Sequence, residues 1–121
     1  DAAEAIVIAS PVYFATVPAS LKAFLDRCQP YWARRYVLGE PVRDPRRPGA
    51  LLLVRSGGDP FGWECAVAPV KSAFAVLGVQ LGELLEVEGP DAPGDVDARP
   101  ESLERAQEIG GALVSAALAG R

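Results

Sequence analysis

Two short loops contain the residues of this sequence that are best suited to bind a ligand. The first, Ser10-Pro11-Val12-Tyr13-Phe14-Ala15-Thr16-Val17, follows the apolar run 5–9, and the second, 56–63, follows the apolar run 50–54. Both loops combine small residues or glycines, which let a ligand approach the backbone, with aromatic side chains that can lie against a flat ring. Neither loop offers an acid–base pair or an activated nucleophile. The residue types therefore favour a planar, hydrogen-bonding cofactor over hydrolytic chemistry.

Composition excludes several other kinds of site. The 121 residues include no His, so Ser-His-Asp and Cys-His catalysis and imidazole metal ligation are excluded. Cys28 and Cys65 stand 37 positions apart, and no further Cys completes a zinc or iron–sulfur site. We predict no metal site and no catalytic side chain. The two Cys are predicted to be buried free thiols, which slightly favours the cytoplasm.

The charge pattern and the missing motifs narrow the function classes. A net charge of −4 argues against nucleic acid as the main partner. No run is long and apolar enough for a membrane span, and no signal segment, G-x-G-x-x-G, phosphate-loop or G-x-S-x-G motif occurs. Residues 34–55 carry six Arg and a local charge of +4. Because this stretch is rich in Pro, a solvated loop is favoured, with a contact to a nucleotide phosphate as the alternative.

Three apolar segments are predicted as strands. Runs 5–9 and 50–54 are short, continuous and apolar, which is typical of strands buried on both faces of a parallel sheet. Segment 79–88 alternates apolar with acidic residues, and it therefore predicts an edge or half-exposed strand.

Helices are predicted between and after these strands. Pro18 begins the first, and Pro30 should end or kink it. Asp59-Pro60 is predicted to cap the second, which ends at Gly78 and is kinked at Pro69. Pro100 begins the third, with Glu101 and Arg105 paired on its outer side. The apolar stripe of this third helix is expected to comprise Leu103, Ala106, Gly110, Leu113 and Ala117.

The alternation of strands and helices predicts one α/β domain over residues 1–121. Its three strands should form a parallel sheet with three main helices distributed over both faces. In such sheets ligands bind beyond the carboxyl ends of the strands, where both loops are expected to lie.

The motifs of the first loop and helix carry a family resemblance. They are Ser10-Pro11-Val12-Tyr13-Phe14, Leu21-Lys22-Ala23-Phe24 and Asp26-Arg27, followed later by Gly57-Gly58 and Gly94-Asp95. In this order and spacing they resemble the NADPH-dependent FMN reductase family, and within it the iron–sulfur flavoproteins and multimeric flavodoxin-like oxidoreductases. The resemblance covers most of the chain, and its first motif is the most specific part.

The resemblance implies a flavodoxin-like, three-layer α/β/α fold with an FMN site. The loop that wraps the isoalloxazine ring would be formed here by Ser10, Pro11, Val12, Tyr13, Phe14 and Ala15. The loop bordering the same ring would be formed by Ser56, Gly57, Gly58 and Asp59. Backbone amides directed at the pyrimidine edge would favour the reduced, anionic flavin, while the aromatic side chains hold the ring.

Relatives begin with a strand and a Ser/Thr/Gly-rich phosphate-binding loop, and neither is present here. The chain also has no Met. We therefore expect it to correspond to the carboxyl-terminal two-thirds of the fold, starting at the third strand of the family.

The resemblance implies an FMN-dependent NAD(P)H oxidoreductase. NADPH or NADH would be the hydride donor, and a small molecule or a redox protein would be the acceptor. The alternatives are a flavodoxin-like electron carrier and a catalytically silent FMN-binding fragment. A homodimer or homotetramer is expected, with Tyr31, Trp32 and Tyr36 forming either a subunit contact or a contact to their own sheet. Structural roles are expected for Lys22, Asp26 and Arg27, and core packing for Trp63.

Overall fold

Three parallel strands form one sheet at the centre of the fold. In the computed structural model, which describes residues 2–42 and 46–120, the strand order is β1-β2-β3. The strands are β1 (Ile6–Pro11), β2 (Arg47–Arg55) and β3 (Val79–Glu88). Ser10 of β1 pairs with Leu53 of β2, which pairs in turn with Glu86 of β3. The three predicted strands and their parallel arrangement are therefore confirmed.

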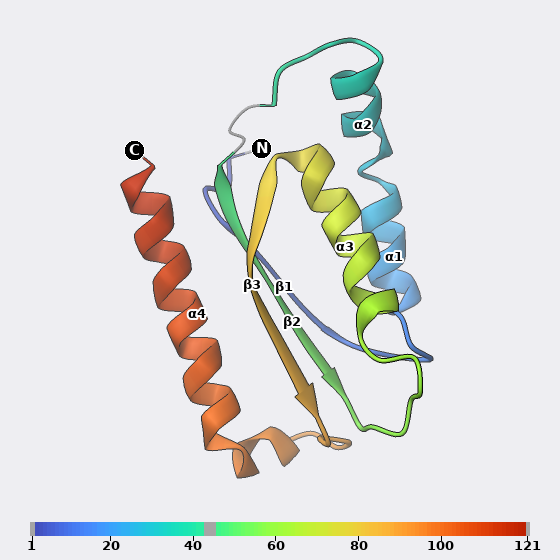
Figure 1. Cartoon of the computed structure of the whole chain (residues 1–121), viewed down its shortest axis with the longest axis vertical. Coiled ribbons are helices and arrows are strands. Elements are labelled where there is room, and N and C mark those ends of the chain that lie inside the picture. The colour runs from blue at the N-terminus through green and yellow to red at the C-terminus, as the bar shows by residue number, and fades with distance from the viewer. Residues whose placement is uncertain (1, 43–45, 121) are drawn as a thin grey trace.

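Helices cover both faces of this sheet (Figure 1). Helices α1, α2 and α3 lie on one face and α4 on the other, which gives the predicted three layers. A 3₁₀ helix precedes α4. The helices are α1 (Ala19–Asp26), α2 (Gln29–Tyr36), α3 (Glu64–Leu77) and α4 (Pro100–Ala119), and the 3₁₀ helix is Asp95–Ala98.

The larger core lies between the sheet and α3. Leu51 and Leu53 of β2 and Val70 of α3 have no exposed surface, and Phe74 of α3 has almost none. A smaller cluster of Ala50, Ile109 and Leu113 joins the other face of β2 to α4. β2 is therefore buried on both faces, as a central strand of a parallel sheet should be.

The predicted end of α3 is confirmed, but its predicted start is wrong. Gly78 adopts a left-handed conformation at φ +70° and ends the helix. The helix begins at Glu64 rather than near Asp59-Pro60. The carboxylate of Asp59 instead accepts a hydrogen bond of 2.8 Å from the Phe61 amide, which stabilises a turn within the loop.

Other differences from the sequence prediction arise from packing. β1 was predicted to be buried on both faces, but Val7 is half-exposed because α4 packs mainly on β2 and β3. Pro30 does not only end a helix: it lies in the first turn of the additional short helix α2. Leu103 and Gly110 of the predicted α4 stripe are exposed, and Ile109 takes the buried position.

The arginine-rich segment 34–55 is not a solvated loop throughout, because its two ends lie in α2 and β2. Arg47 is buried in β2 and donates a hydrogen bond to the Leu77 carbonyl, and Arg35 of α2 donates to the Ala75 carbonyl. Both guanidinium groups thus satisfy carbonyls at the carboxyl end of α3, where a helix dipole favours cations. Arg34 pairs with Glu40 at 2.6 Å. Of the predicted cluster, Arg43 lies outside the described residues.

The predicted surface pairs are partly confirmed. Lys22 and Asp26 form the expected pair along α1, and both are exposed. Arg105 does not pair with Glu101. It pairs instead with Glu83 of β3 at 2.8 Å and with Glu108 at 3.1 Å, so it links α4 to the sheet.

Both Cys are free, but only one is buried. Cys28 is buried, and this burial raises the pKa of its thiol, whereas Cys65 is exposed at the start of α3. The prediction of two buried thiols is therefore wrong for Cys65.

We expect Cys65 to react with a thiol reagent such as DTNB at least tenfold faster than Cys28, because only an accessible thiolate reacts readily. The Cys65→Ser variant should show a single slow phase, and the Cys28→Ser variant a single fast one. Equal rates for the two variants would contradict the burial of Cys28.

Among the described residues, no helix combines the length and apolarity needed to cross a membrane.

Trp32 and Tyr36 are partly exposed on α2, with ring centroids 5.6 Å apart. Self-association through this pair remains a prediction.

Candidate functional site

The first loop forms a tight turn immediately after β1. Tyr13 and Thr16 pair through two backbone hydrogen bonds of 2.9 and 3.2 Å, which close a turn around Phe14 and Ala15. These two residues have φ angles of +49° and +68°, a left-handed conformation that is unfavourable for residues other than Gly. The Phe14 ring is fully exposed, and Tyr13 is 60% exposed. The turn is therefore strained and presents aromatic side chains to solvent.

The second loop connects β2 to α3 through residues 56–63. Gly57, Gly58 and Gly62 all have positive φ angles, so the loop takes a path that L side chains rarely allow. At Gly58 and Gly62, no described atom of another segment lies within 4 Å of where a Cβ would stand. Phe61, between them, is 70% exposed. The backbone of this loop is therefore accessible to a ligand, with an aromatic side chain beside it.

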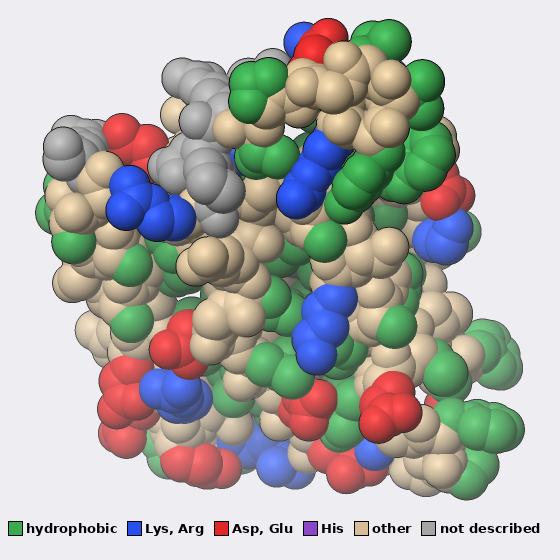
Figure 2. All heavy atoms as spheres, turned by 45° about the horizontal axis from the view of Figure 1, so that its top comes forward, with side chains coloured by type: hydrophobic (Ala, Val, Ile, Leu, Met, Phe, Trp, Pro, Cys, Tyr) green, Lys and Arg blue, Asp and Glu red, His purple; other side chains and the backbone are tan. Residues whose placement is uncertain are grey.

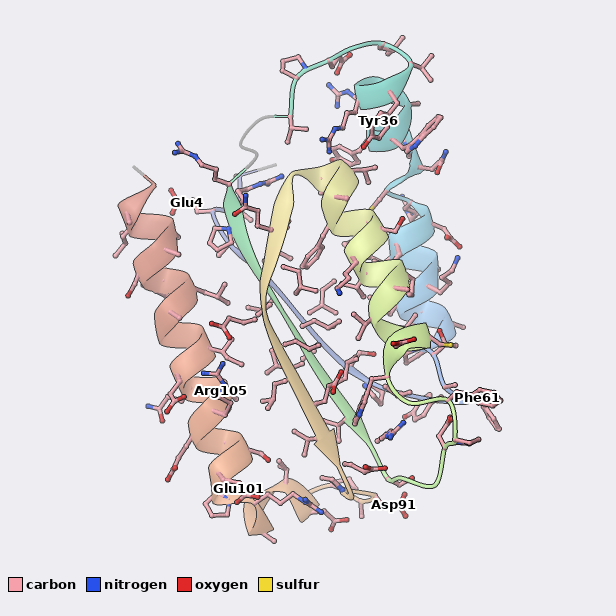
Figure 3. All side chains as sticks on the ribbon, viewed as in Figure 1. Glu4, Tyr36, Phe61, Asp91, Glu101 and Arg105 are labelled. Carbon is pink, nitrogen blue, oxygen red and sulfur yellow. The ribbon has the colours of Figure 1, made fainter. Side chains whose placement is uncertain are left out.

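The sheet brings the two loops together at its carboxyl edge. Pro11, the last residue of β1, is in register with Val54 of β2, and the Val12 amide donates to the Val54 carbonyl at 2.8 Å. Both loops lie at the lower right of Figure 1, and Phe61 projects there in Figure 3. This juxtaposition of the two predicted loops is confirmed.

A proline in α3 permits a bond between the first loop and this helix. Pro69 has no backbone N–H, so it cannot donate to the carbonyl of Cys65 four residues earlier. The Thr16 hydroxyl donates to that carbonyl instead, at 3.1 Å. The first turn of α3 is thereby tied to the strained turn after β1, a role for Pro69 that its helical position alone does not reveal.

This bond predicts a coupling between Thr16 and Pro69. Thr16→Val should lower the free energy of unfolding by about 1 kcal/mol, because it leaves the Cys65 carbonyl without a donor. In a Pro69→Ala background the restored helical N–H satisfies that carbonyl, so the same substitution should cost less. Urea denaturation of the four proteins measures the coupling. Additive effects would contradict the bond.

The site residues predicted from the sequence differ in how far their side chains are exposed to solvent. Ser10 and Val12 bury their side chains, and the Ser10 hydroxyl donates to the Pro11 carbonyl at 2.8 Å. The exposed surface of the first loop is therefore formed by Pro11, Tyr13, Phe14 and Thr16, and Ala15 is partly buried. In the second loop, Ser56 and Gly58 are exposed, while Gly57 and Asp59 are partly buried.

Sequence analysis missed one residue of this region. Arg55, the last residue of β2, directs its guanidinium over the Trp63 ring, with Cζ 4.2 Å from the ring centroid. Trp63 also packs against the core, as predicted. The local sequence offers no signal for this contact beyond Arg at a strand end.

The loop after β3 adds negative charge at the same edge. The Asp91 and Ala92 amides each donate to the Asp95 carboxylate at 2.9 Å, and these bonds lower the pKa of Asp95. Asp91 lies at the carboxyl end of β3 in Figure 3, and Figure 2 shows acidic side chains gathered toward the lower end of the molecule. This acidic loop therefore lies at the same edge of the sheet as the candidate site.

The two loops fit a flat ring better than a metal ion. Among the described residues, no cluster of three or more His, Cys, Asp or Glu could hold a metal. An exposed aromatic turn and a glycine-rich loop with accessible backbone lie at the same edge of the sheet, and a planar heterocycle can bind through such apolar surfaces and backbone groups. The Arg55 Nε atom, close behind this surface, is buried and has no acceptor among the described residues. The isoalloxazine ring of FMN is compatible with this arrangement.

Comparisons with known proteins agree with the fold and the motifs. The chain is 28% identical over 120 residues to an FMN-dependent NADH:quinone oxidoreductase of Gluconobacter oxydans, covering 93% of this chain and 59% of the relative. It is 27% identical over 116 residues to an iron–sulfur flavoprotein of Archaeoglobus fulgidus, covering 96% of this chain and 47% of the relative. The chain thus spans about half the length of these relatives.

A solved structure supports the fold. A cysteine-to-serine mutant of flavodoxin from Pseudomonas aeruginosa superposes with a TM-score of 0.52 at 22% identity, covering 90% of this chain and 69% of that protein. The architecture is therefore flavodoxin-like. The family model described as NADPH-dependent FMN reductase matches residues 1–83, which include both loops. With more than half of its length matched, the chain belongs to the NADPH-dependent FMN reductase family.

Proposed function

We propose that this chain binds the isoalloxazine ring of FMN between its two loops and that it is part of an NAD(P)H-dependent oxidoreductase. The observation that carries the proposal is the strained turn at Phe14 and Ala15, which presents exposed aromatic rings beside the open backbone of Gly58 and Gly62. Strain of this kind persists where the surrounding structure supports it, and it is common at ligand sites.

Each loop has a distinct role in this proposal. Tyr13, Phe14 and Phe61 provide apolar surfaces that hold the ring and exclude water from the side they cover. The accessible backbone around Gly58 and Gly62 orients the polar edge of the ring through hydrogen bonds. Bound FMN supplies the hydride chemistry, so no His or acid–base pair is required of the chain.

The names of the relatives support the proposed donor and acceptor. The proposed hydride donor is NADH or NADPH. The proposed electron acceptor is a small molecule such as a quinone, because the Gluconobacter relative is an NADH:quinone oxidoreductase.

Titration with FMN and with riboflavin tests ring binding. Because the proposed contacts are to the ring, we expect saturable quenching of flavin fluorescence with both compounds, with affinities within about tenfold of each other. Quenching by neither compound would contradict the proposal. Quenching by FMN alone would assign the affinity to the phosphate and would contradict the proposed ring contacts.

Anaerobic mixing of the flavin complex with NADH or NADPH tests the reductase activity. Loss of the visible flavin absorbance, faster than for free FMN, is expected for a reductase. A flavin that binds but stays oxidised with both donors would instead identify an electron carrier.

A further inference from the structure

Arg55 contacts the end of the second loop and the end of β3 at the same time. Its side chain is only 10% exposed. Nη1 donates to the Gly62 carbonyl at 2.8 Å, Nη2 lies 3.2 Å from Glu88 Oε1, and Cζ stacks over the Trp63 ring. These partners belong to the end of the second loop, the end of β3 and the residue preceding α3.

Only an arginine side chain can make this set of contacts. The planar guanidinium donates in two directions within its plane while its face lies on the indole ring. A lysine ammonium in the same place would keep the charge but could not bond to two acceptors and stack at the same time. Removing Arg55 therefore releases three contacts together.

The second loop has few other means of holding its shape. It contains Gly57, Gly58 and Gly62, and glycines lose the most conformational freedom on ordering. The Asp59 turn fixes only the central part of the loop, through the Phe61 amide. Glu88 lies against Gly57, where a Cβ would stand 3.2 Å from Oε1, so the Arg55–Glu88 pair also restrains the start of the loop.

We propose that Arg55 is the positioning residue of the second loop: it acts through Gly62, Trp63 and Glu88 to fix residues 56–63 as a preformed wall of the site. Its effect on flavin binding rests on the proposed function, but its effect on the order of the loop does not. A preformed loop avoids the entropy cost of ordering when a ligand binds.

Three variants test this role by ¹⁵N relaxation of the backbone amides without any ligand. In Arg55→Met, the order parameters of amides 57–59 and 61–63 should fall from about 0.85 to below about 0.6, while those of amides 50–53 in the centre of β2 stay near about 0.85. Arg55→Lys should lower the order parameters of the same segment, because charge without the planar fork is not sufficient. Arg105→Met is the matched control. It also removes an arginine that pairs with two acids, but it lies on α4, away from Phe61 in Figure 3, and should leave the loop unchanged.

The same variants are then titrated with FMN. Arg55→Met should weaken binding about tenfold, the value of one hydrogen bond to a charged group, and Arg105→Met should not weaken it. If the wild-type chain binds no flavin, the proposed function fails, yet the relaxation experiment still decides the role of Arg55.

Unchanged order parameters of residues 57–63 in a folded Arg55→Met chain would overturn the proposal, and so would wild-type order parameters in Arg55→Lys. If Arg55→Met does not fold, Glu88→Gln replaces it, because the Glu88 side chain is 52% exposed and tolerates substitution. That variant should lower the order parameters of Gly57 and Gly58, and unchanged values there would also count against the proposal.

Discussion

Replacing Gly49 by alanine should lower the free energy of unfolding by about 2–3 kcal/mol, an expected cost of overpacking a dense core. A Cβ at this position would lie 2.5 Å from Val79 Cγ1 and 2.8 Å from Phe74 Cε2. Both neighbours are buried in the larger core, so neither can move aside without opening it. Urea denaturation followed by circular dichroism measures the effect.

Gly82 provides the matched control. It lies in β3, next to β2, but no described atom of another segment is within 4 Å of its virtual Cβ. Gly82→Ala should therefore change the free energy of unfolding by no more than about 0.5 kcal/mol. Similar losses for both variants would contradict close packing at Gly49 as the cause of the effect.

Replacing Phe14 by alanine should weaken flavin binding about tenfold, because stacking on an aromatic ring contributes about 1–3 kcal/mol. The Phe14 ring is fully exposed, so its removal creates no cavity and should change the free energy of unfolding by less than about 0.5 kcal/mol. Flavin fluorescence titration together with urea denaturation separates the two effects.

Phe24→Ala is the control for this prediction. Phe24 is also exposed, but it lies on α1 rather than in either loop. Its removal should leave flavin binding unchanged. Equal weakening in the Phe24 and Phe14 variants would argue that exposed aromatic surface, rather than the turn, determines the affinity.

Those parts of the fold that local patterns specify could be predicted from the sequence. The apolar run before Arg55 predicts the central strand, and Gly78 predicts the end of α3, because each depends on a short stretch of chain. The half-exposed face of β1 could not be predicted, since it depends on where α4 packs. Burial of Arg47 was missed for a similar reason: its acceptor is the Leu77 carbonyl, 30 residues away.

The sequence predicts which loops form the candidate site, but it does not predict the backbone geometry of those loops. Aromatic residues and glycines after two strands indicated where a ligand would lie, and the register of the sheet brings those loops together. Phe14 and Ala15 adopt positive φ angles, and because neither residue is a glycine, the sequence does not indicate this conformation. The Thr16–Cys65 bond joins positions 49 residues apart, so no local pattern predicts it.

The most direct test of the two-loop site is an amide chemical-shift map recorded during titration with FMN. We expect shifts concentrated in amides 13–17, 56–59 and 61–63, with the amides of α4 near Leu113 unchanged. Shifts absent from both loops at flavin saturation, or concentrated elsewhere in the fold, would contradict a ring site at the carboxyl edge of the sheet.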